Sequence, residues 1–310
     1  MALRLVFFGT PQFAVPSLQA LLASHQVVGV VCQPDRPAGR GQHLTPPPVK
    51  EVATAAAIPI FQPEKLRQPA VIEQLQQWAP EAIIVVAYGK ILPRAILDLP
   101  RLGCINVHAS LLPKYRGAAP IQWAIYHGEP TTGVTIMHIN ERMDAGDMLL
   151  QRSTAIGSQE TYGELQQHLA TIGAQALIET IDGLIAGKIT PTAQDEAQAT
   201  YAPLVTKENG RIDWNASAVQ IERMIRAFQP WPSAYTGLDG KRLQIHRAEV
   251  AAADAAGAAA GTVIAVDEAI AIACGEGVLR AHELQLEGRR RLPAAEIARA
   301  GVLRVGSRLG

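Results

Sequence analysis

Residues 81–113 read EAIIVVAYGKILPRAILDLPRLGCINVHASLLP, and this stretch decides the fold class. Two short apolar runs, Ile83–Tyr88 and Cys104–His108, flank a segment with helical spacing at Leu92–Leu97. Strands that are apolar on both faces and separated by helices are typical of parallel β-α-β units. The stretch therefore predicts a doubly wound, mostly parallel α/β sheet.

The same alternation continues on both sides of this stretch, across residues 1–189. Further strands are predicted at Leu3–Phe8, Val27–Val31, Val134–Ile139 and Leu149–Ile156. Further helices are predicted at Phe13–Leu22, Val49–Ala57, Val71–Trp78, Ile121–Tyr126 and Tyr162–Ala186. In such sheets ligands bind at the carboxyl ends of the strands, so we expect the chemistry in the loops that follow them.

The pattern changes after Gly187. Residues 190–206 are polar, rich in turn formers and without a clear period, which is typical of a linker. From residue 207 to 310 one helical segment, Ala216–Ala227, precedes closely spaced short strands. These strands are predicted at Ala234–Leu238, Leu243–Val250, Gly261–Val266, Ala269–Cys274 and Val278–Leu286. We therefore expect a second domain that is a small β-barrel or sandwich.

The composition is that of an ordinary globular protein, with 48% hydrophobic and 18% charged residues among 310. Basic and acidic residues number 28 each, so any attraction to a nucleic acid must be local. No apolar run approaches the roughly 20 residues of a membrane-spanning helix, and the apolar start is too short for a secretory signal. Three cysteines without a CxxC pair suggest neither a disulfide framework nor a zinc cluster. A cytoplasmic protein without a membrane partner is expected.

A candidate site lies at the end of the strand Cys104–His108. Period two places Asn106 and His108 on one face, with His108 last in the strand. The next strand is followed by ERMDAGDM, so Asp144 reaches the same edge if the two strands are neighbours. An amide that binds an oxyanion, an imidazole that transfers a proton and a carboxylate that orients the imidazole suit attack on a carbonyl carbon. No serine occupies a nucleophile elbow, so the attacking group is expected to come from the substrate.

Spacing alone leaves other readings of these residues open. His108 fits a structural histidine and Asn106 a hydrogen-bonded strand amide. Asp144 fits a turn residue or helix cap, and Asp147 competes with it for a catalytic role. Cys104 fits a nucleophile paired with His108, although a buried apolar thiol is the more usual state of such a cysteine.

A long insertion, PDRPAGRGQHLTPPPVK at Pro34–Lys50, separates the second strand from the next helix. Its five prolines and two glycines argue against regular structure, and loops of this length are usually functional or disordered. The insertion holds Arg36, Arg40 and Lys50 against Asp35. The turn GTPQF after the first strand lacks the glycines of a dinucleotide fingerprint and the GK[ST] of a P-loop, so a tight turn is expected there.

Several longer motifs resemble those of a known protein family, and they are more specific than the spacing of single residues. NVHASLLPKYRGAAPIQWAI (106–125), VVAYGKILP (85–93) and MDAGDM (143–148) closely resemble the folate-dependent formyltransferase family. FFGTPQFA, QPDRPAGRG, RIDW and IRAFQPWPSA are similar to the members of that family that act on an aminoacyl-tRNA. The resemblance covers both domains and fades after about Gly288. It implies a Rossmann-like catalytic domain followed by an OB-like β-barrel that binds tRNA.

The activity that the resemblance implies is formyl transfer from 10-formyltetrahydrofolate to an amine. The amine would be the α-amino group of methionine on initiator tRNA, for translation initiation. Asn106 and His108 would stabilise the tetrahedral oxyanion, and Asp144 would hold His108 and assist proton removal. The formyl donor is itself activated, so no metal is implied, and a monomer is expected.

The resemblance also assigns binding residues. Those implied for the folate are Tyr88, Gly89, Ile91, Leu92, Ser110, Leu111, Leu112 and Pro113. Those implied for the acceptor end of the tRNA are Arg36, Arg40 and Lys50, with Arg40 at the position of the family's key arginine. The arginines implied for tRNA phosphates are Arg289, Arg290 and Arg291, for which a solvated charge run is the alternative.

Two other functions remain open at this point. The same catalytic trio, Asn106, His108 and Asp144, and the same folate motifs are also expected in formyltransferases that act on a sugar nucleotide or another small amine. A non-catalytic RNA-binding module is a third possibility, which the intact trio argues against. The roles of Lys114 and Arg116 also stay open between the tRNA, the folate and the conformation of their own loop.

Overall fold

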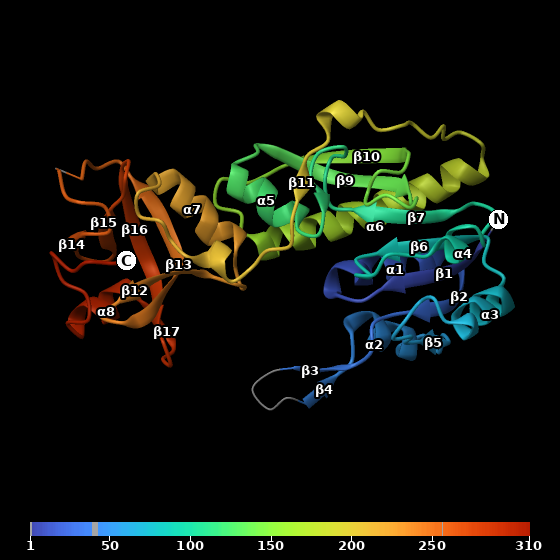
Figure 1. Ribbon diagram of the computed structural model, residues 1–310, viewed down its shortest axis with the longest axis horizontal. Helices are drawn as coiled ribbons and strands as arrows, with labels where there is room; N and C mark the ends of the chain where they lie inside the picture. The colour runs from blue at the N-terminus through green and yellow to red at the C-terminus, as the bar shows by residue number, and fades with distance from the viewer. Residues whose placement is uncertain (1, 39–42, 256) are drawn as a thin grey trace. The chain divides into compact units, whose positions relative to one another are not determined.

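The computed structural model describes residues 2–38, 43–255 and 257–310 (Figure 1). The chain divides into two compact units. Unit 1 comprises Met1–Pro120, Thr131–Ala155 and Gln166–Ala202. Unit 2 comprises Ile121–Pro130, Ile156–Leu165 and Pro203–Gly310. Each unit is therefore assembled from segments that are separated in the sequence.

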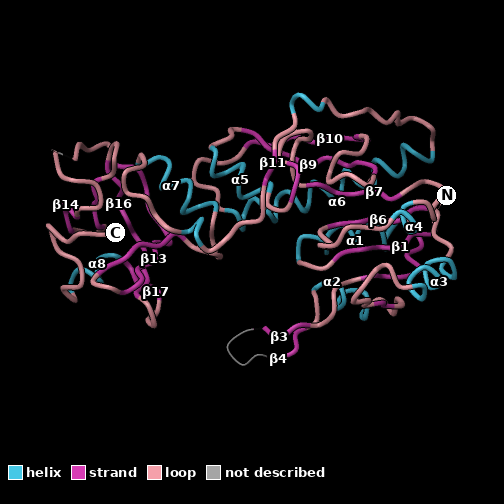
Figure 2. The backbone as a smooth tube through the Cα atoms, viewed as in Figure 1, coloured by secondary structure: helices cyan, strands magenta, loops and turns pink. Residues whose placement is uncertain are grey.

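Unit 1 is built on a mixed sheet with the strand order β10-β9-β7-β6-β1-β2-β5, labelled in Figure 1 and coloured magenta with the other strands in Figure 2. Its parallel strands are β1 (Arg4–Gly9), β2 (Gln26–Val31), β5 (Ile60–Phe61), β6 (Ala82–Val86) and β7 (Cys104–His108). β9 (Thr131–His138) is antiparallel to both of its neighbours, β7 and β10 (Met148–Ala155). The predicted doubly wound, mostly parallel sheet is confirmed.

The direction of β9 corrects the expectation that the strands follow one another in parallel β-α-β units. Ile105 pairs with His138 and His108 pairs with Thr135, so β9 ends beside the start of β7. An antiparallel strand at one side of an otherwise parallel sheet is common. Antiparallel neighbours such as β9 and β10 need no crossover, and the short segment 139–147 is enough to join them.

Helices cover both faces of this sheet. They are α1 (Val15–Ser24), α2 (Pro48–Ala55), α3 (Pro69–Trp78), α4 (Arg94–Leu97) and α6 (Tyr162–Ile185), with a short 3-10 turn, η1, at Gln12–Ala14. α6 approaches the face that carries Val107, where a Cβ on Gly173 would lie 2.8 Å from the valine side chain. The opposite face carries a buried cluster that includes Val6, Ile83 and Cys104. By strand alternation Asn106 and His108 lie on the same face as this cluster.

The predicted loop between β2 and α2 contains regular structure after all. β3 (Arg36–Ala38) pairs with β4 (His43–Thr45) as an antiparallel hairpin. Proline is tolerated in such edge strands because it removes only a donor that faces away from the partner. Arg40 lies outside the described residues.

The expected linker, residues 190–206, makes backbone contacts with unit 1 over much of its length. It contains η2 (Glu196–Gln198) and β11 (Tyr201–Ala202), and β11 pairs in parallel with β8 (Arg116–Gly117). Thr192 exchanges backbone hydrogen bonds of 2.8 and 2.9 Å with Met148. Residues up to Ala202 accordingly belong to unit 1, and unit 2 resumes at Pro203.

Unit 2 carries the antiparallel sheet expected of the second domain, in the order β12-β13-β16-β15-β14, with β17 beside β16. The strands are β12 (Ala234–Leu238), β13 (Lys241–Ala251), β14 (Val263–Val266), β15 (Ile270–Ala273), β16 (Val278–Leu286) and β17 (Arg291–Pro293). The helical segments that follow Pro203 in this unit are η3 (Glu208–Gly210), α7 (Ala218–Ala227) and α8 (Ala294–Arg299).

An aromatic cluster joins separate segments of unit 2. Helix α5 (Pro120–His127) contributes Trp123 and Tyr126, and Phe228 follows α7. The Tyr126 and Phe228 rings stack with centroids 5.4 Å apart, and Trp123 meets Phe228 edge-on at 5.8 Å. The Trp123 indole N–H donates to the Pro203 carbonyl at 2.7 Å. The segment 121–130 is thus part of the packing of unit 2.

Candidate active site

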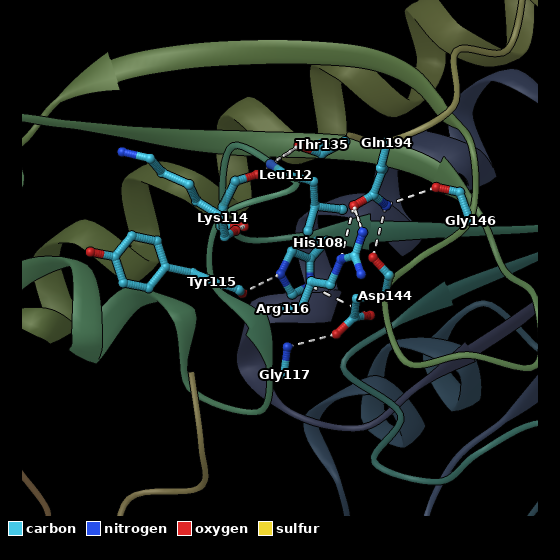
Figure 3. Close-up of polar contacts among 11 residues, drawn as sticks. His108, Leu112, Lys114, Tyr115, Arg116, Gly117, Thr135, Asp144, Gly146 and Gln194 are labelled. Atoms are coloured by element: carbon cyan, nitrogen blue, oxygen red, sulfur yellow. Dashed lines mark hydrogen bonds and ion pairs between the residues drawn. The ribbon is translucent and has the colours of Figure 1, made fainter. Parts of the chain in front are cut away.

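His108 ends β7 with both ring nitrogens facing oxygen atoms (Figure 3). Its side chain is only 6% exposed. Nε2 lies 2.9 Å from the carbonyl oxygen of Tyr115. A carbonyl only accepts, so Nε2 carries the proton of this hydrogen bond. Nδ1 lies 3.7 Å from Asp144 Oδ1, and it is the nitrogen turned toward the carboxylate.

Asp144 reaches His108 by a different path from the predicted one. Because β9 ends beside the start of β7, the segment 139–147 has to return along the sheet to place Asp144 near the strand's carboxyl end. Asp144 has a left-handed backbone with φ of +48°, and its Oδ2 accepts a hydrogen bond of 2.8 Å from the Gly117 N–H. The predicted imidazole and carboxylate are therefore brought together.

Asp147 and Cys104, the alternatives weighed above, lie elsewhere. Asp147 is exposed, and its charge acts on His138, whose pKa is lowered by burial and only partly restored by Asp147. Cys104 is buried, and burial raises the pKa of its thiol to about 12. A thiol held protonated in this way is a poor nucleophile.

Asn106 occupies the position on β7 one pleat below His108. Its Cα partners in the sheet are Val85 and Met137, and its side chain is half-buried. The structure records no hydrogen-bond partner for this amide within residues 2–38, 43–255 and 257–310. Its donors are therefore available to a bound molecule.

The turn SLLP after β7 is fixed by two residues that sequence analysis did not single out, Thr135 and Gln151. The Thr135 hydroxyl donates to the Ser110 carbonyl at 2.7 Å and accepts from the Leu112 N–H at 3.0 Å. Gln151 Nε2 donates to the Leu112 carbonyl at 2.8 Å. Only the pairing of β9 with β7 and β10 brings Thr135 and Gln151 to this turn, so no local sequence signal marks them.

Within SLLP, the side chains of Ser110 and Leu112 point into the protein. Both are buried, and the Ser110 hydroxyl donates to the Lys114 carbonyl at 2.6 Å. Leu111 and Pro113 are partly exposed. Any contact that this turn makes with a ligand therefore falls to its main chain and to these two side chains.

The predicted folate residues of AYGKILP divide in the same way. Tyr88 is 2% exposed, with its ring edge-on to Phe8 at 5.1 Å, and Leu92 is 5% exposed in the same buried cluster. Ile91, by contrast, is 77% exposed, and Gly89 has φ of +84° with open space at its Cβ position. Of the four predicted folate residues in this segment, Gly89 and Ile91 are thus the ones open to a ligand.

Among the predicted tRNA residues, Arg36 is exposed on β3 and Lys50 is engaged at the base of the insertion. Lys50 Nζ lies 2.7 Å from Asp35 Oδ2, and Gln62 Nε2 donates to Asp35 Oδ1 at 2.8 Å. The hydrogen bonds from Gln62 and then Lys50 lower the pKa of Asp35. Lys50 therefore closes the base of the hairpin, where its charge is partly neutralised.

The arginine run of unit 2 is also partly paired. Arg291 lies 2.5 Å from Glu283, and Arg290 lies 3.9 Å from Glu296. Arg289 is exposed on the turn between β16 and β17. Within the described part of the chain, no three His, Cys, Asp or Glu side chains gather as metal ligands, and no helix is long and apolar enough to cross a membrane.

Comparison with known families places this chain in a class. Residues 3–181 match the model of the formyl transferase family, and residues 204–301 match that of the formyl transferase C-terminal domain. The chain belongs to the formyl transferase family, as the motifs around His108 predict.

The curated relatives narrow the class further. Methionyl-tRNA formyltransferase of Geobacter sulfurreducens is 47% identical over 99% of this chain and 97% of its own length. That of Acidobacterium capsulatum is 51% identical over 99% of this chain and 100% of its own.

Solved structures share the fold at lower identity. An N-formyltransferase from Helicobacter canadensis, in complex with folinic acid and dTDP-3-aminofucose, matches with a TM-score of 0.66 and 18% identity, over 91% of this chain and 99% of its own. HypX from Aquifex aeolicus, in complex with tetrahydrofolic acid, matches with a TM-score of 0.65 and 19% identity, over 96% of this chain and 47% of its own.

Proposed function

We propose that this protein transfers the formyl group of 10-formyltetrahydrofolate to the α-amino group of methionine on initiator Met-tRNA, for translation initiation. The observation that carries the proposal is the placement of Asp144 beside His108, with Asn106 one pleat below on β7, in a chain that is 51% identical to a methionyl-tRNA formyltransferase over 99% of its length. The formyl donor is already an activated amide, so the reaction requires binding, orientation and proton transfer rather than a metal.

In the proposed mechanism the methionine amine attacks the formyl carbon. The new C–N bond turns the formyl oxygen into an oxyanion, to which the free amide of Asn106 donates. A single donor of this kind typically contributes about 10²- to 10³-fold in rate. The His108 Nδ1 side, facing Asp144, carries the proton that leaves the amine. Cleavage of the bond to the folate nitrogen, which takes up a proton, releases tetrahydrofolate and formyl-Met-tRNA.

The folate is proposed to lie against the two turns that follow β6 and β7. Gly89 and Ile91 are open to solvent on the first turn, and Leu111 and Pro113 are partly exposed on the second. Tyr88, Leu92, Ser110 and Leu112 support these turns from within through their buried side chains. Residues 1–189 would thus form the catalytic domain.

Residues 207–310 are proposed to form an OB-like domain that contacts the tRNA, with 190–206 between the two domains. Its candidate phosphate contacts are Arg289, which is exposed, and Arg290, whose charge is less fully neutralised than that of Arg291. We expect a monomer that acts in the cytoplasm, where translation begins. Sedimentation of the purified protein checks the first expectation.

Purified protein should formylate initiator Met-tRNA with 10-formyltetrahydrofolate, and elongator Met-tRNA much less. Acid-gel separation of formylated from free Met-tRNA measures both substrates side by side. A dTDP-amino sugar is the third acceptor, because the fold is shared with an enzyme solved in complex with one. Formylation of the sugar alone would replace the proposal by the second function, and no product with any acceptor would end it.

Arg40→Ala should lower kcat/KM for Met-tRNA about 10- to 100-fold, the range expected for one lost charge-assisted contact. Affinity for the folate, measured by fluorescence titration, should stay unchanged. Lys50→Met is the matched variant of the same insertion, and it should have the smaller effect because Lys50 is already paired with Asp35. Weakened folate binding in Arg40→Ala would contradict the assignment of Arg40 to the tRNA.

A further inference from the structure

Arg116 is the largest fully buried side chain in the described part of the chain, and it lies directly beside His108 and Asp144 (Figure 3). Its side chain is 2% exposed. Nε and Nη2 donate to Gln194 Oε1 at 3.0 and 2.8 Å, and Nη1 donates to Glu196 Oε2 at 3.0 Å. An arginine is almost never fully buried unless its charge is paired. Both of these partners, Gln194 and Glu196, belong to the segment 194–202.

These donors fix the orientation of the Gln194 amide. Because Arg116 occupies Oε1 twice, Nε2 must point the other way, and there it donates to the carbonyls of Asp144 and Gly146, both at 2.8 Å (Figure 3). The amide thus uses two acceptor and two donor positions, which is its full capacity. Gln194 is 9% exposed, so water does not readily replace these bonds.

Tyr115 and Asp144, whose oxygen atoms face the two ring nitrogens of His108, both have left-handed backbones, with φ of +60° and +48°. Such a conformation is unfavourable for a residue other than glycine and persists only where the surroundings hold it. The segment 194–202 holds both. Thr200 accepts from the Tyr115 N–H at 2.9 Å, and Gln194 donates to the Asp144 carbonyl.

We propose that the segment 194–202 positions the active site, with Gln194 holding Asp144 and Thr200 holding Tyr115 on the two sides of the His108 imidazole. Gln194 and Thr200 are positioning residues, since they act through Asp144 and Tyr115. Arg116 serves the same function one step further away by orienting the Gln194 amide. The consequence for turnover rests on the proposed function, whereas the placement of Asp144 does not.

The competing explanation is that Gln194 only neutralises the polarity of a buried arginine. Gln194→Glu separates the two. A glutamate keeps the size of the side chain and still accepts from Arg116, but it has no N–H to donate to Asp144 and Gly146. Gln194→Met removes both functions. Gln198→Glu and Gln198→Met are the matched controls, because Gln198 is exposed on the same segment and, among the described residues, its side chain bonds only to the Asp195 carboxylate, at 2.8 Å.

Two measurements on the full-length protein test the proposal. In the formylation assay, Gln194→Glu and Gln194→Met should both lower kcat and kcat/KM together by about 10²-fold, as expected when a reacting group is misplaced by about 1 Å. In native-state hydrogen exchange, the Gly117 amide, which donates to Asp144 Oδ2, should exchange roughly tenfold faster in both variants. The amides of β1 should be unaffected, and both Gln198 variants should match the unmodified protein.

The outcomes distinguish the possibilities. Gln194→Glu with normal kcat and slow Gly117 exchange would overturn the proposal in favour of simple pairing of Arg116. Equal acceleration at Gly117 and in β1 would also overturn it, because it would mean global loss of stability. If the unmodified protein formylates no acceptor, the proposed function fails, and Gly117 exchange still decides whether Gln194 positions Asp144.

Discussion

His108→Ala should lower kcat for Met-tRNA formylation by about 10²- to 10⁴-fold, the usual contribution of a positioned proton-transfer group. The imidazole contacts the Tyr115 carbonyl through Nε2 and faces the Asp144 carboxylate through Nδ1. Alanine removes both contacts and, with them, the imidazole that takes up the amine proton. Folate binding should persist, because the turn SLLP, one of the two turns proposed to bind it, is held by Thr135 and Gln151.

The loss must be separated from simple destabilisation, because His108 is buried. His108→Gln does so, since the glutamine amide has a donor for the Tyr115 carbonyl but no group that exchanges a proton at neutral pH. Its kcat should fall nearly as far as that of the alanine variant, while its urea midpoint stays closer to that of the unmodified protein. His25→Gln, the same change at a distant half-buried site, is the control. Near-normal turnover in His108→Gln would remove His108 from proton transfer.

Gly146→Ala should reduce the free energy of unfolding by about 3 kcal/mol and also reduce activity. A Cβ on this residue would lie 1.8 Å from the carbonyl oxygen of His138, and backbone atoms of β9 cannot move aside as a flexible side chain would. Overpacking of this kind typically costs about 1 to 3 kcal/mol and occasionally more. The segment 139–147 would have to shift, and Asp144 with it. Urea unfolding followed by circular dichroism measures the first effect, and the formylation assay measures the second.

Gly163→Ala is the matched control for this change. Gly163 lies in the first turn of α6, and nothing stands within 4 Å of its Cβ position. Alanine is favoured over glycine in a helix by up to about 1 kcal/mol, so this variant should be as stable as the unmodified protein or slightly more so. A Gly146→Ala variant as stable as Gly163→Ala would show that the approach of segment 139–147 to β9 is not tight.

Local sequence patterns were enough to predict the sheet and the face on which Asn106 and His108 lie. Apolar runs such as Ile83–Val86 read as buried strands whatever their neighbours, and the two-residue period of β7 is a local property. The direction of β9 is not local. Its sequence has the same strand pattern in either direction, and only its partners determine which end lies beside His108.

Burial divided the candidate ligand residues in a way that motif matching could not foresee. Tyr88 and Ile91 stand three positions apart in one motif, yet one is in the core and the other in solvent. Gln194, by contrast, was not singled out by the sequence although it is buried among polar partners. Its polar surroundings are typical of a linker, and its partners Arg116 and Asp144 are 78 and 50 positions away. Contacts between residues so far apart in the sequence cannot be predicted from the pattern of neighbouring residues.

The division of the chain has a consequence for work with fragments. Unit 2 includes Ile121–Pro130 and Ile156–Leu165, so a recombinant piece that begins at residue 203 would lack two of its segments. Phe228 would lose the rings of Trp123 and Tyr126 that pack on it. Such a piece is expected to expose apolar aromatic surface and therefore to aggregate. During synthesis on the ribosome, likewise, the aromatic cluster can pack only after Phe228 has emerged, which is nearly a hundred residues after the segment 121–130.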